Sequence, residues 1–547
     1  MASSQNYNTW TNADLIHRVT TLETQLRARN AEIALLSTPS PPKKQPKKTP
    51  KPFDPSRYNT RLIALKFAYL GGRYNGFEHH TGNTTPLPTI EEELWKALKK
   101  TRLILTQAEE VNWEGCEYSK CGRTDRGVSA FGQVIGIRVR SAKPVKREGV
   151  KAAVEIGEDG EVKGREDGVA LADDEDVTEE PKWDAVKDEL PYIQLLNRVL
   201  PQDIRMLAWC PDPPEDFSAR FNCRERRYRY FFSNPAYPPV PVSQPKGVMG
   251  EGWLDIPAMQ KAAAKYEGLH DFRNFCKIDA SKQITNYDRR IFSARVRQVG
   301  SDDSEDAAKE RARESYKMTA QPSLYYFEVR GSAFLWHQVR HLIAVLFLVG
   351  QGYEQPSIVD DLLDPFKVKA KPNYEMASDV PLVLWDCIFP DLEKLKGADH
   401  VYGERAGKVS YQDGMNWIYV GDEVGGRENA KRQIPGVEDG KYGRNGLLED
   451  LWALWRTRKM DEILAGGLME VVSRQGFVPK ASDAVSLSNV QRSDRVYDGS
   501  EMPRTVGTYT PLLQRSRTEP FEVLNARYAA RKGLNAAPKD GADVDVE

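Results

Sequence analysis

A short stretch at residues 118–133, YSKCGRTDRGVSAFGQ, contains the residue types that a catalytic loop needs. At its centre Asp125 stands between Arg123 and Arg126. Nearby positive charge favours the ionised form of a carboxylate. Two glycines bracket the turn, and glycine permits sharp backbone angles and the close approach of a ligand. The pattern predicts an ionised nucleophile or base; a salt-bridged surface turn is the other interpretation of so short a motif.

A second segment, residues 217–233 (FSARFNCRERRYRYFFS), interleaves five arginines with aromatic residues and has a single glutamate. In a strand, Tyr228 and Tyr230 would lie on one face, with Arg227 and Arg229 on the other. Aromatic rings among arginines suit RNA, because bases stack on rings while guanidinium groups hold phosphates. An amphipathic strand with a basic, solvated face fits the segment equally well.

A third segment, Ala333–Val349 (AFLWHQVRHLIAVLFLV), is apolar almost all round and predicts a buried helix that ends at Gly350. Arg340 lies in its middle, and a buried guanidinium group needs a carboxylate or phosphate partner. His337 and His341 lie one turn apart, but no third ligand is evident. We therefore interpret both as structural histidines rather than metal ligands.

Regular elements flank these residues. Val134–Val139 reads as a buried strand that follows the Asp125 loop, and Thr89 with Glu92 forms a capping box that opens a helix through Lys100. The other strands are expected at Arg61–Tyr69, near Tyr325–Val329 and at Pro381–Pro390, and a further helix near Met259–Tyr266.

The N-terminal part of the chain has two predicted sections. Residues 1–36 carry a heptad-like apolar series, which indicates either a short coiled coil or an amphipathic helix packed on its own chain. Residues 37–56 form a Pro/Lys linker, because proline recurs too often for a helix or a central strand. This linker could act as a nuclear-localisation signal, an RNA-contacting arm or a solubilising spacer.

Residues 57–390 form the predicted catalytic domain. It is interrupted by an acidic insertion at 149–181 and a charged insertion at 300–317, both expected to be disordered. Residues 391–547 form a partly disordered C-terminal extension with one amphipathic helix, Leu447–Ile463.

Bulk composition places few limits on function. The 547-residue chain is 40% hydrophobic and has a net charge of -1, but the acidic residues are concentrated in segments, so neutrality does not exclude nucleic acid. Six cysteines occur without a C-x-x-C pair, which predicts reduced thiols with neither zinc nor a disulfide framework. The longest apolar run, Leu342–Val349, is too short to cross a bilayer, and no signal peptide is evident. We expect a soluble, intracellular protein.

Several motifs in order resemble one family, the TruA-type pseudouridine synthases, and within it the eukaryotic branch that modifies uridines 38 and 39 of the tRNA anticodon stem-loop. The resemblance covers about residues 57–390 and, more weakly, 509–533. Its motifs are GRTDRGVSA at 122–130, ARF…RRYRY at 219–230, DFRNF at 271–275, AFLWHQVR at 333–340 and the PLVLWD strand.

The resemblance implies roles for individual residues. Asp125 matches the essential aspartate, Tyr228 the ring that stacks on the target uracil, and Arg340 the basic partner of the aspartate. Arg123 matches an arginine that helps to displace the target nucleotide, and Leu382 the apolar residue beneath the base. Arg126, Arg227 and Arg229 complete the predicted substrate-binding set. The chain departs from bacterial members at Gly76-Phe77, where they have Gly-Trp.

The resemblance also implies an α+β fold of two ferredoxin-like (RRM-like) halves. Together they form a central mixed, mainly antiparallel sheet with a basic cleft. It implies a tRNA substrate, no cofactor and no required metal. Bacterial members are homodimers, and the N-terminal heptads are compatible with a homodimer here. We expect a nuclear and cytoplasmic protein that does not bind membranes.

Two alternatives remain open. One is a multisite enzyme of the same family that acts on other tRNA positions or on small nuclear RNA. The other is a non-catalytic tRNA-binding or chaperone protein, against which the intact Asp, Tyr and Arg set argues. The sequence does not choose between attack at C6 of the base and events at C1′ of the sugar.

Overall fold

The computed structural model describes residues 11–36, 57–82, 85–144, 183–238, 252–300, 322–391, 393–395, 411–422, 440–476 and 495–533. The predicted linker and the acidic insertion lie outside these residues, as does the charged insertion beyond Gly300. The chain divides into two compact units, Met1–Ser56 and Arg57–Glu547. No helix among the described residues is both long and apolar enough to span a membrane.

The first unit contributes one described helix, α1 (Asn12–Leu36). The predicted helix is therefore confirmed. Apolar side chains of the heptad series are exposed along it, namely those of Leu15, Val19, Leu22 and Leu26. Its pairing as a coiled coil stays a prediction.

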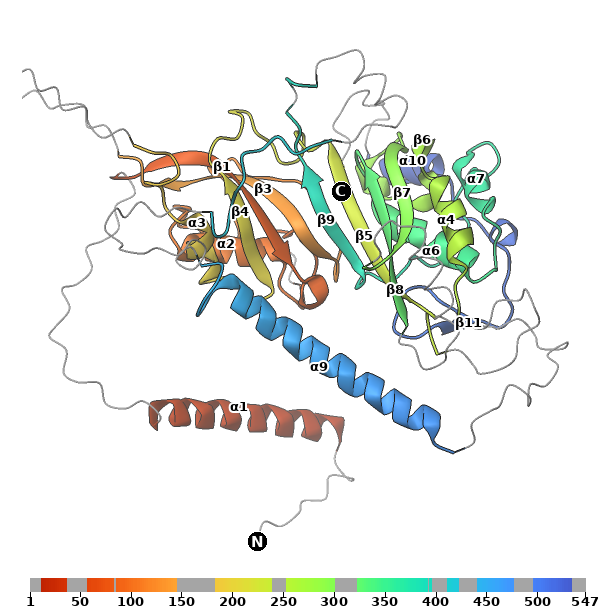
Figure 1. Ribbon diagram of the computed structural model, residues 1–547, viewed down its shortest axis with the longest axis horizontal. Coiled ribbons are helices and arrows are strands. Elements are labelled where there is room, and N and C mark those ends of the chain that lie inside the picture. Colours follow the sequence, from red (N-terminus) through yellow and green to blue (C-terminus); the bar gives the residue numbers. More distant parts are fainter. Residues whose placement is uncertain are drawn as a thin grey trace, which may run out of the picture. The chain divides into compact units, whose positions relative to one another are not determined.

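The second unit is built on a ten-stranded mixed sheet (Figure 1). Its neighbouring strands pair antiparallel except β3 and β9, which pair in parallel through Ser129 and Ala130 opposite Val383 and Leu384. The strand order is β10 (Ile418–Tyr419), β4 (Ile204–Cys210), β1 (Asn59–Tyr69), β3 (Ser129–Ser141), β9 (Leu382–Ile388), β5 (Glu225–Asn234), β8 (Ser323–Gly331), β7 (Asp288–Gln298) and β6 (Gly268–Asp271), with β2 (Ser119–Lys120) paired to β3 outside this path. The structure thus confirms an α+β protein with a mixed, mainly antiparallel sheet.

Helices α2 and α4 lie near their predicted positions, whereas α9 continues eleven residues beyond its predicted end at Ile463. The Thr89 half of the predicted capping box is confirmed, because the amide of Glu92 donates to Thr89 Oγ1 at 3.3 Å at the start of α2. The Glu92 carboxylate pairs with Lys96 at 2.6 Å. Helix α4 packs against both helix α6 and strand β7 of the sheet. The helices are α2 (Ile90–Lys100), α3 (Tyr192–Asn197), α4 (Ile256–Ala264), α6 (Gln338–Gly350), α7 (Ile358–Leu363), α9 (Leu447–Arg474) and α10 (Phe521–Lys532).

Helix α6 is buried along its whole length, as its apolar sequence predicts, but the predicted start at Ala333 is wrong. The helix begins at Gln338, because His337 adopts a left-handed backbone conformation with φ 62°. That conformation interrupts helical hydrogen bonding, so residues 333–337 form an irregular turn before the helix. The turn brings His337 to the N-terminal end of α6, next to the sheet.

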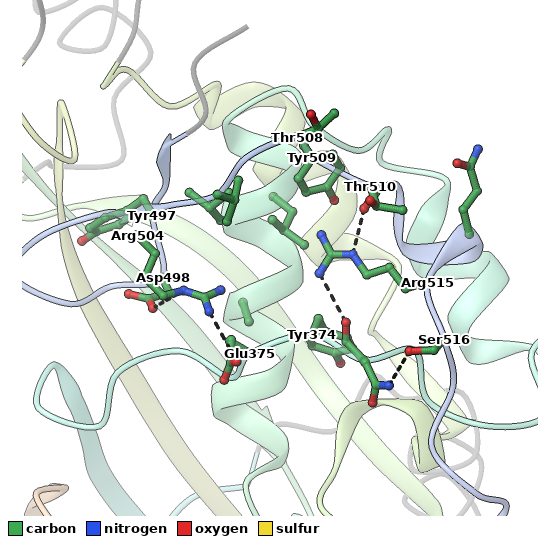
Figure 2. A pocket seen from close by; sticks show the side chains of 16 residues that line it. Tyr374, Glu375, Tyr497, Asp498, Arg504, Thr508, Tyr509, Thr510, Arg515 and Ser516 are labelled. Atoms are coloured by element: carbon green, nitrogen blue, oxygen red, sulfur yellow. Dashed lines mark hydrogen bonds and ion pairs between the residues drawn. The ribbon is translucent and has the colours of Figure 1, made fainter.

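Residues 495–533 of the C-terminal extension pack on α6 and its neighbours, whereas α9 is exposed along most of its length. The ring of Tyr497 contacts Phe347 of α6 at a centroid distance of 4.8 Å, and Tyr509 stacks on Tyr353 at 4.4 Å. Figure 2 shows the pocket of about 750 Å³ that these segments line, where Arg504 lies 3.3 Å from Glu375. Arg504 is thus paired with Glu375 and Asp498, whereas Arg515 of the same pocket donates to the backbone carbonyls of Thr510 and Asn373. Packing of the extension covers one side of α6.

Candidate active site

Asp125 projects from the loop between β2 and β3, as the sequence predicts. The loop requires glycine at one position, because Gly127 has φ 82° and a Cβ added there would lie 2.7 Å from Asp379 Oδ2. The amide of Val128 donates to the carbonyl of Asp125 at 3.2 Å and closes the turn. The carboxylate is thus carried by a loop with one fixed turn rather than by a free surface segment.

A buried hydrogen-bond network fixes the first half of this loop. Gln133 of β3 accepts from the amide of Gly122 at 3.1 Å and donates to its carbonyl at 2.9 Å. The Tyr69 hydroxyl lies 2.7 Å from Thr124 Oγ1 and 3.4 Å from Gln133 Nε2. Because both Gln133 and Tyr69 are fully buried, the loop backbone next to Asp125 is positioned by two strands of the sheet.

Two groups at the start of α6 approach the Asp125 carboxylate. His337 Nε2 lies 3.3 Å from Asp125 Oδ2, and Arg340 Nη1 lies 3.6 Å from the same oxygen. Arg340 is oriented by a second contact, since its Nε donates to the carbonyl of Ala377 at 2.7 Å. The predicted pairing of the helix arginine with the loop aspartate is therefore present in the structure. The Asp125 side chain is 19% exposed, so a ligand can still reach it.

The expectation that Arg123 and Arg126 flank the carboxylate is not met. Arg123 Nε lies 3.4 Å from Glu78 Oε1, and Arg126 is exposed to solvent. Burial opposes ionisation of Glu78, but the hydrogen bond and charge of Lys120 outweigh it and lower the pKa of Glu78. Neighbours in an irregular loop project in different directions, so the positive charge that faces Asp125 comes from α6 instead.

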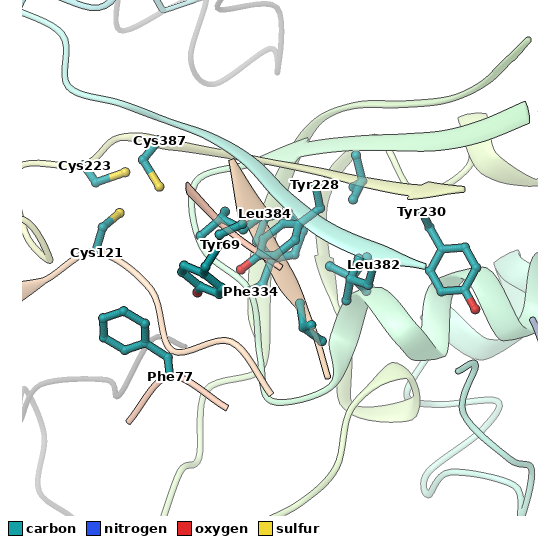
Figure 3. Packing of buried hydrophobic residues seen from close by; sticks show 14 of the residues in the cluster. Tyr69, Phe77, Cys121, Cys223, Tyr228, Tyr230, Phe334, Leu382, Leu384 and Cys387 are labelled. Atoms are coloured by element: carbon teal, nitrogen blue, oxygen red, sulfur yellow. The ribbon is translucent and has the colours of Figure 1, made fainter. Parts of the chain in front are cut away.

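Five predicted residues nevertheless line one pocket: Arg123, Asp125, Tyr228, Arg340 and Leu382. Tyr228 is 7% exposed and packs edge-on against Phe334, with ring centroids 5.0 Å apart (Figure 3). Burial raises the pKa of Tyr228 well above its ordinary value, so the phenol stays protonated. The cavity volume is only about 30 Å³.

Arg227 and Arg229 do not line this pocket. They project from the face of β5 opposite to Tyr228, in agreement with the predicted alternation. Arg227 Nε lies 2.5 Å from Glu225 Oε1; Arg229 pairs with Glu328 at 2.8 Å and lies over the ring of Trp385 at 3.9 Å. Their predicted contact with RNA stays a prediction, and it would use the other face of the sheet.

Sequence reasoning missed His337 as a site residue, because it treated His337 and His341 as one structural pair. The structure separates them. Burial, followed by the charge of Lys371, lowers the pKa of His341 well below its ordinary value, whereas His337 faces Asp125. The signal that could have found His337 is its place three residues before Arg340, on the same motif.

The pocket does not have the ligands of a metal centre among the described residues, since Asp125 and His337 supply one carboxylate and one imidazole. The one potential metal-ligand group found in the described part of the chain consists of three cysteines outside this pocket. The arrangement instead offers an oriented carboxylate beside a protonated phenol and an apolar wall. The carboxylate could attack a polar ring bound in the pocket, the apolar wall could stack against that ring, and the phenol could donate a proton to it.

Comparison with known proteins assigns the chain to a family. A sequence profile described as tRNA pseudouridine synthase matches residues 262–390. The tRNA pseudouridine(38/39) synthase of Saccharomyces cerevisiae is 32% identical over 536 residues, which cover 96% of this chain and 92% of that protein. The chain belongs to the tRNA pseudouridine synthase family.

Other members of the family match parts of this synthase. The human tRNA pseudouridine(38/39) synthase is 42% identical over 348 residues, covering 63% of the chain and 59% of the human protein. A tRNA pseudouridine synthase A from Methanothrix thermoacetophila is 27% identical over 334 residues, which cover 60% of this chain and 84% of the archaeal protein. The profile match contains His337, Arg340 and Leu382, whereas Asp125 and Tyr228 precede it. The synthase pocket is thus assembled from residues inside and outside the profiled segment.

Proposed function

We propose that this chain isomerises uridine to pseudouridine at positions 38 and 39 of the tRNA anticodon stem-loop. Its yeast and human relatives carry that specificity in their names. The observation that carries the proposal is the placement of the Asp125 carboxylate in one pocket with Tyr228, Leu382 and the paired Arg340.

The reaction moves a glycosidic bond without changing the atoms of the nucleotide. The bond between N1 and C1′ breaks, the base turns, and a bond forms between C5 and C1′; C5 loses a proton and N1 gains one. Asp125 would act as the ionised nucleophile, at C6 of the base or at C1′. Arg340 and His337 would hold it in the attacking orientation.

Tyr228 and Leu382 would hold the base on either side. A phenol that stays protonated can donate to a ring nitrogen or carbonyl, and its ring offers a stacking surface. The target base must leave its helical stack first, at a cost of a few kcal/mol, which basic contacts to the backbone offset.

The small cavity implies that the pocket opens when a base enters. A volume of about 30 Å³ holds roughly two water molecules, far less than a uracil ring. Phe334 and Leu335 cover the pocket from the irregular turn before α6 rather than from the helix itself. The Phe334 and Leu335 side chains would move aside when the base enters, while His337 of the same turn would keep its contact with Asp125.

We also propose that the sheet consists of two ferredoxin-like halves. The strands β10, β4, β1 and β3 would form one ferredoxin-like half and the strands β9, β5, β8, β7 and β6 the other, with a basic cleft along their junction. The β3–β9 pairing, which the structure limits to two residues on each strand, supports such a junction.

We further propose a homodimer, to which the exposed apolar heptad residues of α1 would contribute. Light scattering of the full chain and of a chain lacking residues 1–36 would test this. A monomeric full chain would contradict it, and an unchanged dimer after deletion would exclude α1.

Tritium release from tRNA labelled at C5 of uridine tests the proposed reaction. Wild-type protein should release tritium, and Asp125→Asn should lower the rate by at least about 1,000-fold while tRNA affinity stays within a few-fold. Asp216→Asn is a matched control, because Asp216 is exposed and outside the pocket. Near-normal release by Asp125→Asn would reject the catalytic assignment.

Two further outcomes address the alternatives. Tight binding of tRNA by the wild-type protein without any release would favour a non-catalytic binding protein. Mapping the modified positions would detect a multisite enzyme if sites other than 38 and 39 react.

A further inference from the structure

Three cysteines that are far apart in the sequence meet outside the pocket. Cys121 follows β2, Cys223 precedes β5, and Cys387 lies in β9. Their sulfur atoms all lie within 4.8 Å of one another, and Figure 3 shows the three side chains converging. All six cysteines of the chain are free thiols. Strand pairing thus joins cysteine positions that are widely separated in the sequence.

The size of this three-cysteine cluster fits a single metal ion. Thiolate sulfur lies about 2.3 Å from zinc, so three sulfurs around one central ion are roughly 4 Å apart. The observed upper limit of 4.8 Å allows that spacing with only small side-chain adjustments. The three residues are 1%, 5% and 0% exposed, which keeps competing water away from their sulfur atoms.

The charge around the cluster favours ionised cysteine sulfurs, the form that binds a metal ion. Arg226 is 2% exposed and lies opposite Cys387 in the pairing of β5 with β9. Its guanidinium group donates to the carbonyls of Cys121, Ser332 and Arg220 at 3.1, 2.8 and 3.0 Å. It forms no ion pair with any carboxylate of the described residues. A buried cation without a counter-ion is costly, and negative charge on the adjacent sulfurs would offset it.

We propose that Cys121, Cys223 and Cys387 bind one thiophilic metal ion through their three sulfur atoms, with Cu⁺ preferred over Zn²⁺. Soft thiolate ligands select such ions. No fourth histidine, cysteine, aspartate or glutamate of the described residues joins the cluster. Structural zinc is almost always four-coordinate, so the three-ligand set favours Cu⁺. Binding would displace the thiol protons, and Arg226 would offset one negative charge of the resulting complex.

The site would position the pocket rather than take part in its chemistry. Cys121 is four residues before Asp125, Cys223 five residues before Tyr228, and Cys387 five residues after Leu382. One ion would thus join the three segments that carry the pocket. Because the cysteines are buried, loading would accompany folding, and the ion would raise the stability of the loaded protein.

The test measures metal content of the full chain, purified anaerobically from cells grown with added copper or added zinc. We expect about one equivalent of copper per chain, displacement of zinc by equimolar Cu⁺, and less than a tenth of an equivalent after alanine substitution of any one of the three cysteines. Cys116→Ala is the matched control and should retain the metal, because Cys116 is also a buried free thiol but lies outside the cluster.

Several outcomes would overturn the proposal. They are less than a tenth of an equivalent of either metal in the wild-type protein, or undiminished metal in the three cluster variants. Bound zinc that equimolar Cu⁺ fails to displace would overturn the three-coordinate assignment. If a cluster variant fails to fold, X-ray absorption of the wild-type protein decides, since three sulfur neighbours at about 2.3 Å are required. None of these results depends on pseudouridine formation.

Discussion

His337 and Asp125 face each other across the junction of α6 and the β2–β3 loop, with 3.3 Å between Nε2 and Oδ2. His337 reaches this position because its backbone adopts φ 62° one residue before the helix begins. Its other ring nitrogen, Nδ1, is buried and has no hydrogen-bond partner among the described residues. A left-handed backbone conformation is unfavourable for histidine, and here it places the ring beside the Asp125 carboxylate.

We predict that His337→Gly lowers the rate of pseudouridine formation by about 10- to 100-fold. A hydrogen bond to a charged group contributes about 1.5–3 kcal/mol, and about 1.4 kcal/mol corresponds to a tenfold change in rate. Glycine tolerates φ 62° without strain, so the free energy of unfolding should stay within about 1 kcal/mol of wild type. Tritium release and chemical denaturation measure the two effects.

His337→Gln supplies the control, because its amide can still donate to the carboxylate. We expect it to recover part of the lost rate. Equal rates for the glycine and glutamine variants would show that the ring nitrogen does not orient Asp125.

Arg340 has two contacts that substitutions can separate. Arg340→Lys should keep a positive charge near Asp125 but lose the hydrogen bond to the Ala377 carbonyl, whereas Arg340→Met loses both. We expect Arg340→Met to lower the free energy of unfolding by about 1–3 kcal/mol and to lower kcat strongly, with Arg340→Lys intermediate. In the Asp125→Asn background the rate effect of Arg340→Met should vanish, because the residues act as a unit. Independent, additive losses would contradict the pairing.

Tyr228→Phe should keep the edge-on contact with Phe334 while removing the hydroxyl. We expect kcat to fall about 10- to 1,000-fold with little change in KM, because general acid–base catalysis contributes on this scale. Because burial raises the pKa of Tyr228 well above 10, the wild-type rate should not decline through this residue between pH 7 and pH 9. Rate–pH profiles of both proteins over this range test the assignment. A decline in wild type that Tyr228→Phe abolishes would contradict it.

Gln133→Leu should loosen the catalytic loop. The variant removes both hydrogen bonds to Gly122 and leaves buried backbone groups unsatisfied, which costs about 1–3 kcal/mol each. We expect lower stability, measured by denaturation, and a kcat that falls more than KM rises, because Asp125 loses its fixed position. Tyr69→Phe is the milder counterpart, since it removes only the hydroxyl that meets Thr124. Unchanged kcat in both variants would show that the network serves folding alone.

The sequence predicted the secondary elements around the site well, because each depends on local patterns. Alternation predicted β1, and the Thr89–Glu92 capping box predicted α2. Apolar residues on all sides of 338–350 predicted the burial of α6. The start of α6 could not be predicted, because no local pattern in the sequence signals the left-handed conformation of His337.

Charge partners and clusters were harder to predict than elements. Sequence adjacency suggested Arg123 and Arg126 as neighbours of the Asp125 carboxylate, yet its partners come from residues more than 200 positions away. The same holds for the three cysteines, which only strand pairing brings together. Long-range contacts of this kind depend on the order of strands in the sheet, which spacing along one sequence does not encode.

The last prediction concerns acid stability and rests on His341. Burial, followed by the charge of Lys371, lowers the pKa of this buried histidine well below 6.5, so it is neutral in the folded protein. Lys371 Nζ lies 3.3 Å from its Nε2, a distance that suits an acceptor nitrogen. The unfolded chain binds a proton near pH 6.5 that the folded chain does not, so His341 contributes stability that is present above that pH and lost as pH falls below it. The slope of the free energy of unfolding against pH from one such group is at most about 1.4 kcal/mol per pH unit.

Denaturation at pH 7.5, 6.5 and 5.5 should show this loss of stability in wild type and a smaller loss in His341→Gln. The control His270→Gln, at a residue outside the pocket, should follow wild type, and parallel curves for all three proteins would contradict the assignment.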